Sequence, residues 1–279
     1  MEYLLISLAL INRLQFKNES MNILKFKYIA IIAGIIFLIT SCNKSKPRKE
    51  KEEETVIEEP VKKLLIPIKL ESKPLVINIK YYEGSAFISE IKSSDGNFNI
   101  TYKDQLPYTI DKYINKVHTQ YIDYRKTANK DSKITFFDVN DAVSTPTGSL
   151  ILKQNIQNQV TAIQASGSGH SYPYNESEWH YSTSGNLSNI TTKASSIKYT
   201  HDEKNGIFKN VQHTQLLFLA IDLPLFSSDM NNRLSYSNTD MPNENTDFEY
   251  KYNVDGYPTQ FTIIKSKQTF TISYIELPQ

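Results

Sequence analysis

Apolar and polar residues alternate through much of the chain from Leu64 onward, and this alternation predicts β-strands. In the stretch 98–102, for example, Phe98, Ile100 and Tyr102 share one face at a period of two residues. Runs of the same kind lie at 64–68, 75–82, 87–92, 133–139, 261–264 and 269–275. Between most of them stand short polar turns, so neighbouring strands are expected to pair as hairpins.

One hairpin design recurs at residues 179–190 and 248–261. In the second copy an aromatic residue, Tyr252, is followed four positions later by Gly256 and nine positions later by the apolar Phe261. Glycine allows positive φ at the turn, and the flanking aromatic residues can pack on one face of a sheet. Looser relatives of this design lie at 152–163 and 102–110.

Two stretches fit more than one element. Residues 108–126 fit either an amphipathic helix or two strands that turn near 115–116, and their aromatic and β-branched content favours strands. Within 207–226, the segment Gln215–Leu223 is the most apolar part of the chain after the N-terminal region. It predicts a short helix packed against the sheet, with a buried central strand as the alternative.

Two further segments are predicted to be loops. Residues 141–149 contain Pro146 and Gly148, which usually interrupt strands. Residues 227–246 are mostly polar, with one short strand-like piece at 233–236. The chain also has 18 Tyr and 13 Phe against 9 Gly and 11 Pro, a composition that favours a mainly all-β, antiparallel fold over low-complexity disorder.

The N-terminal region predicts export and lipid attachment. Lys25 and Lys27 precede an apolar run, 28–39, that is too short to cross a hydrocarbon core of about 30 Å as a helix and fits a signal peptide. The run ends at Ile39-Thr40-Ser41-Cys42, which resembles the bacterial lipobox. That resemblance implies cleavage before Cys42 and acylation of its thiol, and several acyl chains anchor a protein stably.

These observations divide the chain into four parts. Residues 1–20 are predicted to be a mis-annotated extension, because Met21 begins a better signal peptide, which then covers 21–41. Residues 42–63 are rich in Lys and Glu and predict a charged, flexible tether. Residues 64–279 are predicted to form the β-rich domain.

The recurrent hairpins also carry a family resemblance. The segments YKYNVDGYP and HYSTSGNLSNI resemble the Tyr-x-Tyr-Asp-x-x-Gly-x-Leu motif of YD/Rhs-like repeats, and more closely the diverged copies in Gram-negative lipoproteins of a domain-of-unknown-function family. Asn253 and Ser182 stand where the motif has Asp. The resemblance implies a curled, meandering antiparallel sheet of hairpins with at most one or two short helices, and it implies no activity.

Charge and ligand patterns exclude several functions. The formal net charge of +1 creates no field that would favour nucleic acid. The five histidines show no i, i+4 pair typical of metal motifs, and Cys42, the single cysteine, is expected to carry lipid. The sequence therefore predicts no metal and no cofactor.

Exposed aromatic side chains are the remaining candidates for binding. Tyr172, Tyr174, Trp179 and Tyr181 could contact a carbohydrate or a protein, since such rings offer apolar area together with a polar group. The alternative is that these rings cover the sheet's own core.

The functional prediction is a non-enzymatic lipoprotein of the cell envelope that acts as a binding or structural module. Its expected place is the outer membrane, at the periplasmic face or the cell surface. The alternative function is an envelope hydrolase that acts on glycans through catalytic carboxylates which the sequence does not locate.

Overall fold

The computed structural model describes residues 64–277, apart from 95, 129–130, 141–142, 167–174 and 222–228. These residues belong to one compact unit, Pro60–Gln279. The predicted extension, signal peptide, acylated Cys42 and tether lie outside the described residues.

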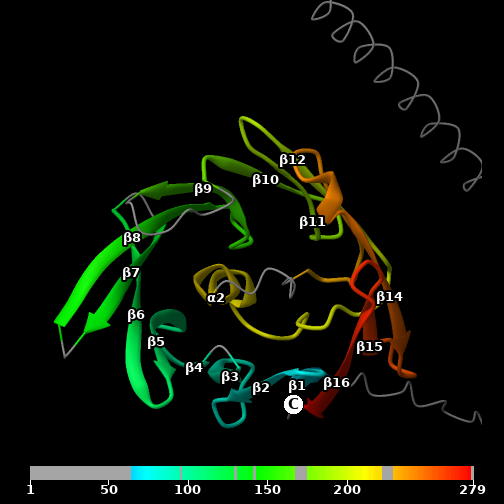
Figure 1. Cartoon of the computed structure of the whole chain (residues 1–279), viewed down its shortest axis with the longest axis horizontal. Helices are drawn as coiled ribbons and strands as arrows, with labels where there is room; N and C mark the ends of the chain where they lie inside the picture. The colour runs from blue at the N-terminus through cyan, green and yellow to red at the C-terminus, as the bar shows by residue number, and fades with distance from the viewer. Residues whose placement is uncertain are drawn as a thin grey trace, which may run out of the picture. The chain divides into compact units, whose positions relative to one another are not determined.

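The described chain forms 16 antiparallel strands that close into a barrel (Figure 1). Each strand pairs with its neighbours in sequence, and the ring is closed by pairing of the first strand with the last, for example Leu70 with Ile272. The strands are β1 (Leu65–Ser72), β2 (Leu75–Tyr81), β3 (Ile88–Ser93), β4 (Gly96–Lys103), β5 (Leu106–Ile114), β6 (Val117–Lys126), β7 (Ser132–Asn140), β8 (Val143–Gln154), β9 (Val160–Ser166), β10 (Ser177–Tyr181), β11 (Leu187–Thr191), β12 (Ser196–His201), β13 (Arg233–Asn238), β14 (Thr246–Tyr252), β15 (Pro258–Ile263) and β16 (Gln268–Glu276).

This architecture confirms the predicted mainly β fold of meandering hairpins. The sequence pattern did not predict closure of the sheet. Closure pairs Glu71 of β1 with Thr271 of β16, and these residues lie near opposite ends of the domain's sequence. Closure removes the two exposed edges that an open sheet would present for aggregation. Pro60–Gln279 therefore contains the whole described core and its own closing pair of strands, which are the features expected of a unit that folds by itself.

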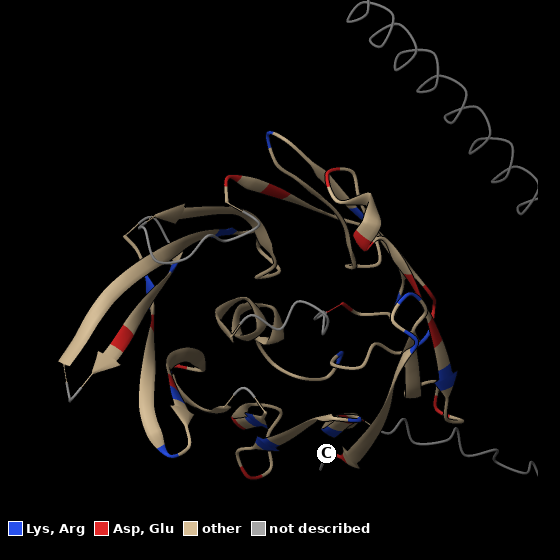
Figure 2. Ribbon diagram, in the orientation of Figure 1, with Lys and Arg blue, Asp and Glu red and all other residues tan. Residues whose placement is uncertain are grey.

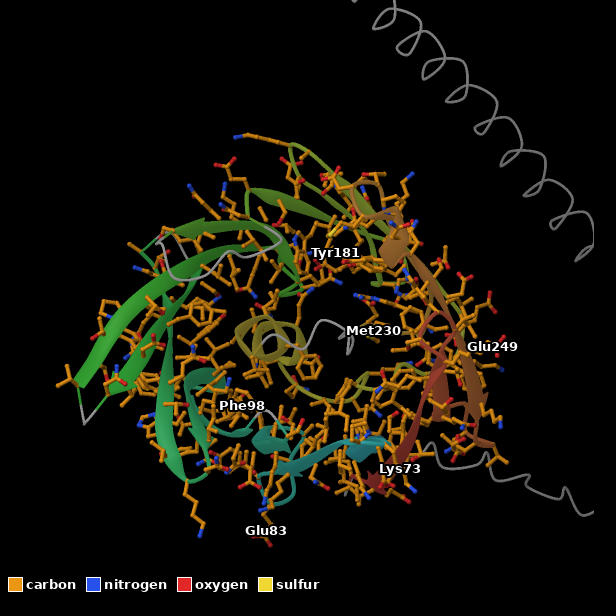
Figure 3. All side chains as sticks on the ribbon, viewed as in Figure 1. Lys73, Glu83, Phe98, Tyr181, Met230 and Glu249 are labelled. Carbon is orange, nitrogen blue, oxygen red and sulfur yellow. The ribbon has the colours of Figure 1, made fainter. Side chains whose placement is uncertain are left out.

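The inner face of the barrel is apolar. Alternate strand residues such as Ile88, Ile134 and Phe270 are fully buried, and they join one continuous core. Figure 3 shows Phe98 and Tyr181 on the inner side of the ring. Wall side chains alone fill a barrel of about eight strands, so a 16-strand ring needs additional material inside.

Part of that material is the connection between β12 and β13, of which residues 202–221 and 229–232 are described; these described residues are here called the plug. It carries the helix α2 (Thr214–Ile221), which lies inside the ring of strands (Figure 1). Every described residue of α2 except Gln215 is buried, as expected for a helix that is apolar around its whole circumference. The predicted short helix is thus confirmed for 214–221, while 222–228 lie outside the described residues.

The outer face of the barrel is polar and charged. Side chains on the outward positions of the strands include the exposed Lys80, Lys92, Lys198, Glu249 and Lys251. Figure 2 shows Lys, Arg, Asp and Glu spread around the ring, and Figure 3 shows Glu249 pointing away from it. Barrels that span a bilayer carry an apolar outer band instead, so this wall is suited to water. Within the described residues, no helix has the length and apolar character needed to cross a membrane.

The two ends of the barrel differ. The chain enters at Leu64 and leaves at Leu277, which are hydrogen-bonded to each other, and the plug lies at the same end. Asn210 of the plug donates to the Leu65 carbonyl at 2.9 Å, and Gln212 N donates to the Ala86 carbonyl in the β2–β3 turn. This end is called the plug end; the opposite end, with the β11–β12, β13–β14 and β15–β16 turns, is called the mouth end.

The recurrent sequence design corresponds to one type of turn at the plug end. In the β14–β15 hairpin, Asn253 N donates to the Tyr257 carbonyl and Gly256 N donates to the Asn253 carbonyl. Gly256 has φ of +77°, which explains why glycine stands there. The β10–β11 hairpin has the same bonds, with Gly185 at φ +85°. The repeat thus reflects turn geometry.

Residues 108–126 form β5 and β6, which confirms the two-strand prediction. Asn115 and Lys116 both have positive φ, as the two central residues of a tight hairpin turn of type I′ require. Asparagine tolerates this left-handed conformation better than most residues.

One predicted loop is wrong. Residues 143–149 belong to β8, which pairs with β7 along its whole length through a bulge opposite Phe136 and Phe137. Among the described residues, β9 pairs with β8 from Ser149 onward, so no described residue of β9 requires an N–H from Pro146. Proline is tolerated at such an unpaired edge. The strand-like piece predicted at 233–236 is confirmed as part of β13.

Candidate functional site

A cavity of about 880 Å³ lies against the inner face of β12–β15. Its wall is mainly aromatic and aliphatic, because the inward positions of these strands carry apolar residues at a period of two. The aromatic lining residues are Tyr199, Tyr236, Phe248, Tyr250 and Phe261. Phe261 is held by stacking on the fully buried Phe270, with ring centroids 4.7 Å apart.

The cavity opens toward the mouth end. Its lining there comes from three turns, through Ala194, Asp240, Glu244 and Lys265, and all four side chains are exposed. Toward the plug end its lining includes Arg233 and residues of the plug. A ligand would therefore enter from the mouth end and meet Arg233 at the base.

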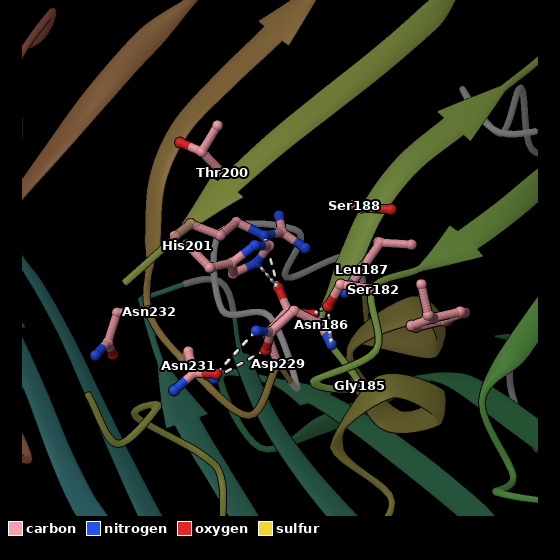
Figure 4. Close-up of polar contacts among 12 residues, drawn as sticks. Ser182, Gly185, Asn186, Leu187, Ser188, Thr200, His201, Asp229, Asn231 and Asn232 are labelled. Atoms are coloured by element: carbon pink, nitrogen blue, oxygen red, sulfur yellow. Dashed lines mark hydrogen bonds and ion pairs between the residues drawn. The ribbon is translucent and has the colours of Figure 1, made fainter. Parts of the chain in front are cut away.

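The base is built on a buried carboxylate, Asp229, at the end of the plug (Figure 4). Arg233 donates from Nε to its Oδ2 at 3.0 Å, and His201 Nε2 lies 2.9 Å from the same oxygen. The other oxygen, Oδ1, accepts a hydrogen bond from the backbone N–H of Leu187 at 2.9 Å. The side chains of Arg233 and Asp229 are 13% and 4% exposed, so this is an almost dry ion pair.

The environment keeps Asp229 ionised. Burial by itself raises the pKa of a carboxyl group, but Arg233, the hydrogen bond from His201 and the Leu187 N–H outweigh it and lower the pKa of Asp229 to about 2. The guanidinium of Arg233 also lies over the ring of Tyr199, with Cζ 3.8 Å from the ring centroid. The position and charge of Arg233 are therefore fixed from two sides.

Amide side chains fasten the plug beside this ion pair. Asn186, in the β10–β11 turn, donates to Asn231 Oδ1 at 2.9 Å and accepts from the Asn231 backbone N–H at 3.0 Å. Asn232 donates to the carboxylate of Asp202, which also accepts a short hydrogen bond from the Tyr252 hydroxyl. The β10–β11 and β14–β15 hairpins thus meet the plug at the base of the cavity.

The Asp229 ion pair should make stability fall in acid. Because the folded-state pKa of about 2 lies below the ordinary value of 3.8, the contribution is present above about pH 4 and is lost as pH falls toward 2. Its size is about 2 to 2.5 kcal/mol. Urea unfolding of Pro60–Gln279 at pH 5, 4 and 3 measures the loss. An Asp229→Asn variant should show a flatter dependence over this interval; an identical dependence would contradict the assignment.

The predicted binding residues are not gathered on the outer surface. Trp179 is 7% exposed and its Nε1 donates to Ser177 Oγ at 2.9 Å. The Tyr181 hydroxyl donates to the Val160 carbonyl at 2.7 Å, and its ring packs against the core. Both rings therefore cover the core of the barrel, the alternative considered from the sequence. Tyr172 and Tyr174 lie outside the described residues, as does Cys42.

The histidines also lie apart. His201 contacts Asp229. His213 of the plug lies with its Nε2 2.7 Å from the Gln105 carbonyl in the β4–β5 turn, and His180 is exposed on the outward face of β10. Across the described part of the chain, no group of three or more His, Cys, Asp or Glu side chains could hold a metal ion.

Sequence reasoning missed the residues at the base of the cavity. Asp229 lies in a segment predicted as a polar loop, and Arg233 begins the short strand-like piece predicted within that segment; nothing in their local pattern indicates burial. Their burial follows from the plug, which carries Asp229 inside the ring. The i, i+4 spacing of the pair is not a useful signal, because ordinary exposed ion pairs share it.

Comparisons with known proteins assign no family. No family model matches the chain, and no curated protein matches it. A porin-like protein from Bacteroides vulgatus has a similar solved structure, with 11% identity, a TM-score of 0.35 and coverage of 75% of this chain and 99% of that chain. A porin-like protein from Bacteroides uniformis has 9% identity, a TM-score of 0.37 and coverage of 76% and 97%.

The expected membership of a YD/Rhs-like lipoprotein family is wrong. No family model matches the chain, and the hairpins close into a single 16-strand barrel in place of the curled sheet that the resemblance implied. The motif-like segments are β-hairpins whose glycine is required by positive φ, a local constraint that unrelated β-proteins share.

Proposed function

We propose that this protein is a lipid-anchored binding module of the cell envelope that holds a small, largely apolar ligand inside its barrel. The observation that carries the proposal is the cavity of about 880 Å³ with aromatic walls and a polar base. Ligand sites typically combine this size, about 300–1,000 Å³, with a mainly apolar lining and a few polar groups. The role is binding without catalysis.

The place of action follows from the anchor and from the outer wall. Acylated Cys42 and the tether attach the barrel to the outer membrane, at the periplasmic face or the cell surface. The polar outer wall keeps the barrel itself in water. Because the tether joins the barrel at the plug end, the mouth lies at the opposite end from the attachment point.

Blocking the cavity tests the binding proposal. Pro60–Gln279 should bind the neutral apolar dye N-phenyl-1-naphthylamine saturably, with enhanced fluorescence. Ile263→Trp places a large side chain on the cavity wall and should weaken binding at least about tenfold, whereas Lys251→Trp, on the outward face of β14, should leave it unchanged. Binding that is not saturable, or that Ile263→Trp does not affect, would contradict a ligand site in the cavity.

Metabolic labelling tests the anchor. The full chain expressed in a Gram-negative host should incorporate labelled palmitate, and Cys42→Ala should abolish incorporation, because Cys42 is the single cysteine. Ser41→Ala, which keeps a small residue before the cysteine, serves as the matched control and should label normally. Equal labelling of the Cys42→Ala chain would refute lipid attachment at this residue.

A further inference from the structure

We infer that the cavity selects uncharged ligands and rejects carboxylates, although an arginine lies at its base. This inference rests on the proposed binding function and specifies the ligand class. An apolar cavity with an arginine at its end would ordinarily suggest a fatty-acid-like ligand whose carboxylate pairs with the guanidinium. The contacts of Arg233 argue for the opposite selectivity.

The charges around the cavity fall into two groups. Asp240, Glu244 and Lys265 line the mouth, where their side chains are exposed and surrounded by water. Charges in such positions are screened and interact weakly with a ligand. Arg233 is the charged lining residue of the described chain that is protected from solvent, so it decides the charge of the base.

Asp229 already neutralises Arg233. The two side chains form an ion pair at 3.0 Å in which Asp229 is 4% exposed, and the backbone N–H of Leu187 holds the carboxylate in place. The guanidinium also stacks on Tyr199. The base of the cavity therefore carries no net charge from this pair, and Arg233 cannot leave Asp229 without exposing a buried anion.

A ligand carboxylate would be the second anion beside a single cation. It would lose its hydration on entering the apolar cavity and would be repelled by Asp229. Among the described residues that line the cavity, the cation away from the mouth is Arg233, which is already paired. A neutral hydroxyl or carboxamide avoids this cost. Such a group can still accept hydrogen bonds from arginine or asparagine side chains, which are the polar lining residues of the base.

Matched ligands test the charge preference. Decanol, decanamide and decanoate share one chain length and differ in the head group. Each is titrated against Pro60–Gln279 carrying bound N-phenyl-1-naphthylamine, at pH 8, where the carboxyl group of decanoate is ionised. Decanol and decanamide should displace the dye at concentrations at least about tenfold lower than decanoate. Concentrations stay below micelle formation, and Lys251→Trp should reproduce the wild-type order.

Removing the internal anion should reverse the preference. In Asp229→Asn the shape of the base is nearly kept and Arg233 loses its counterion, so a ligand carboxylate can take that place. The affinity for decanoate relative to decanol should rise about tenfold or more. Decanoate should also raise the Tm of this variant more than decanol does, while in the wild type it should raise Tm less.

The outcomes separate the two proposals. If decanoate displaces the dye from the wild type as well as decanol does, the charge inference is overturned, although the cavity remains a binding site. If none of the three ligands displaces the dye and Ile263→Trp has no effect on dye binding, the proposed function itself fails. If Asp229→Asn does not fold, the wild-type series alone decides the inference.

Discussion

Replacing Arg233 with Met should destabilise the barrel by about 3–5 kcal/mol, because it leaves the Asp229 carboxylate buried without its cation. Methionine keeps an unbranched apolar chain over Tyr199, so the loss reports mainly on the charge. Urea unfolding of Pro60–Gln279 at pH 7, followed by far-UV circular dichroism, measures the free energy of unfolding.

Two variants serve as controls for this result. Arg125→Met removes the arginine of an ion pair with Asp123 at 2.7 Å whose arginine side chain is 47% exposed, and it should cost less than about 1 kcal/mol. The double variant Asp229→Asn/Arg233→Met removes both buried charges and should recover much of the lost stability. If Arg233→Met and Arg125→Met lower the free energy of unfolding equally, the buried ion pair contributes no more to stability than the exposed one.

Truncating the plug helix should have an effect of similar size. Phe218 of α2 is 5% exposed and packs edge-to-face on Phe208, with ring centroids 4.8 Å apart. Phe218→Ala deletes this ring from the middle of the core and should destabilise the barrel by about 3–5 kcal/mol. The measurement is again the free energy of unfolding in urea.

The same substitution on the outer wall provides the comparison. Phe137 of β7 faces outward, is partly exposed and contacts Tyr121, with ring centroids 5.5 Å apart. Phe137→Ala should cost about 1 kcal/mol, the typical value for a cross-strand aromatic pair. If Phe218→Ala costs no more than Phe137→Ala, α2 does not act as part of the core.

Both predictions concern the plug, because the plug occupies interior space that the closed ring of strands leaves. A ring of 16 strands encloses more space than its own side chains can fill. The helix α2 fills part of the interior with apolar side chains, and the remaining space against β12–β15 is the cavity. The Asp229–Arg233 pair holds the last residues of the plug to β13, so stability and the ligand site depend on the same contacts.

The candidate site was much less predictable than the strands. Trp179 and Tyr181 were recognised as aromatic residues of one hairpin, but the inward or outward direction of a ring depends on strand register. Phe248 and Phe261, which line the cavity, belong to a predicted hairpin that looked no different from the others. Nothing in the sequence indicated that Arg233 and Asp229 are buried, since burial of polar residues depends on what surrounds them in the fold.

The sequence by itself determined the local structure of this protein. Period-two alternation specified the strands, glycine and asparagine specified the turns where φ is positive, and the apolar run at 215–223 favoured a short helix over a buried strand. These features depend on backbone sterics and on side-chain spacing within a few residues.

Only the tertiary structure decided closure, the direction of the apolar face and the site. Pairing of β1 with β16 joins residues about two hundred positions apart, and no local pattern records it. Alternation shows that a strand has two unlike faces but does not say which face meets water. Closure around the plug turned the apolar faces inward, and that step buried Asp229 with Arg233 and created the cavity.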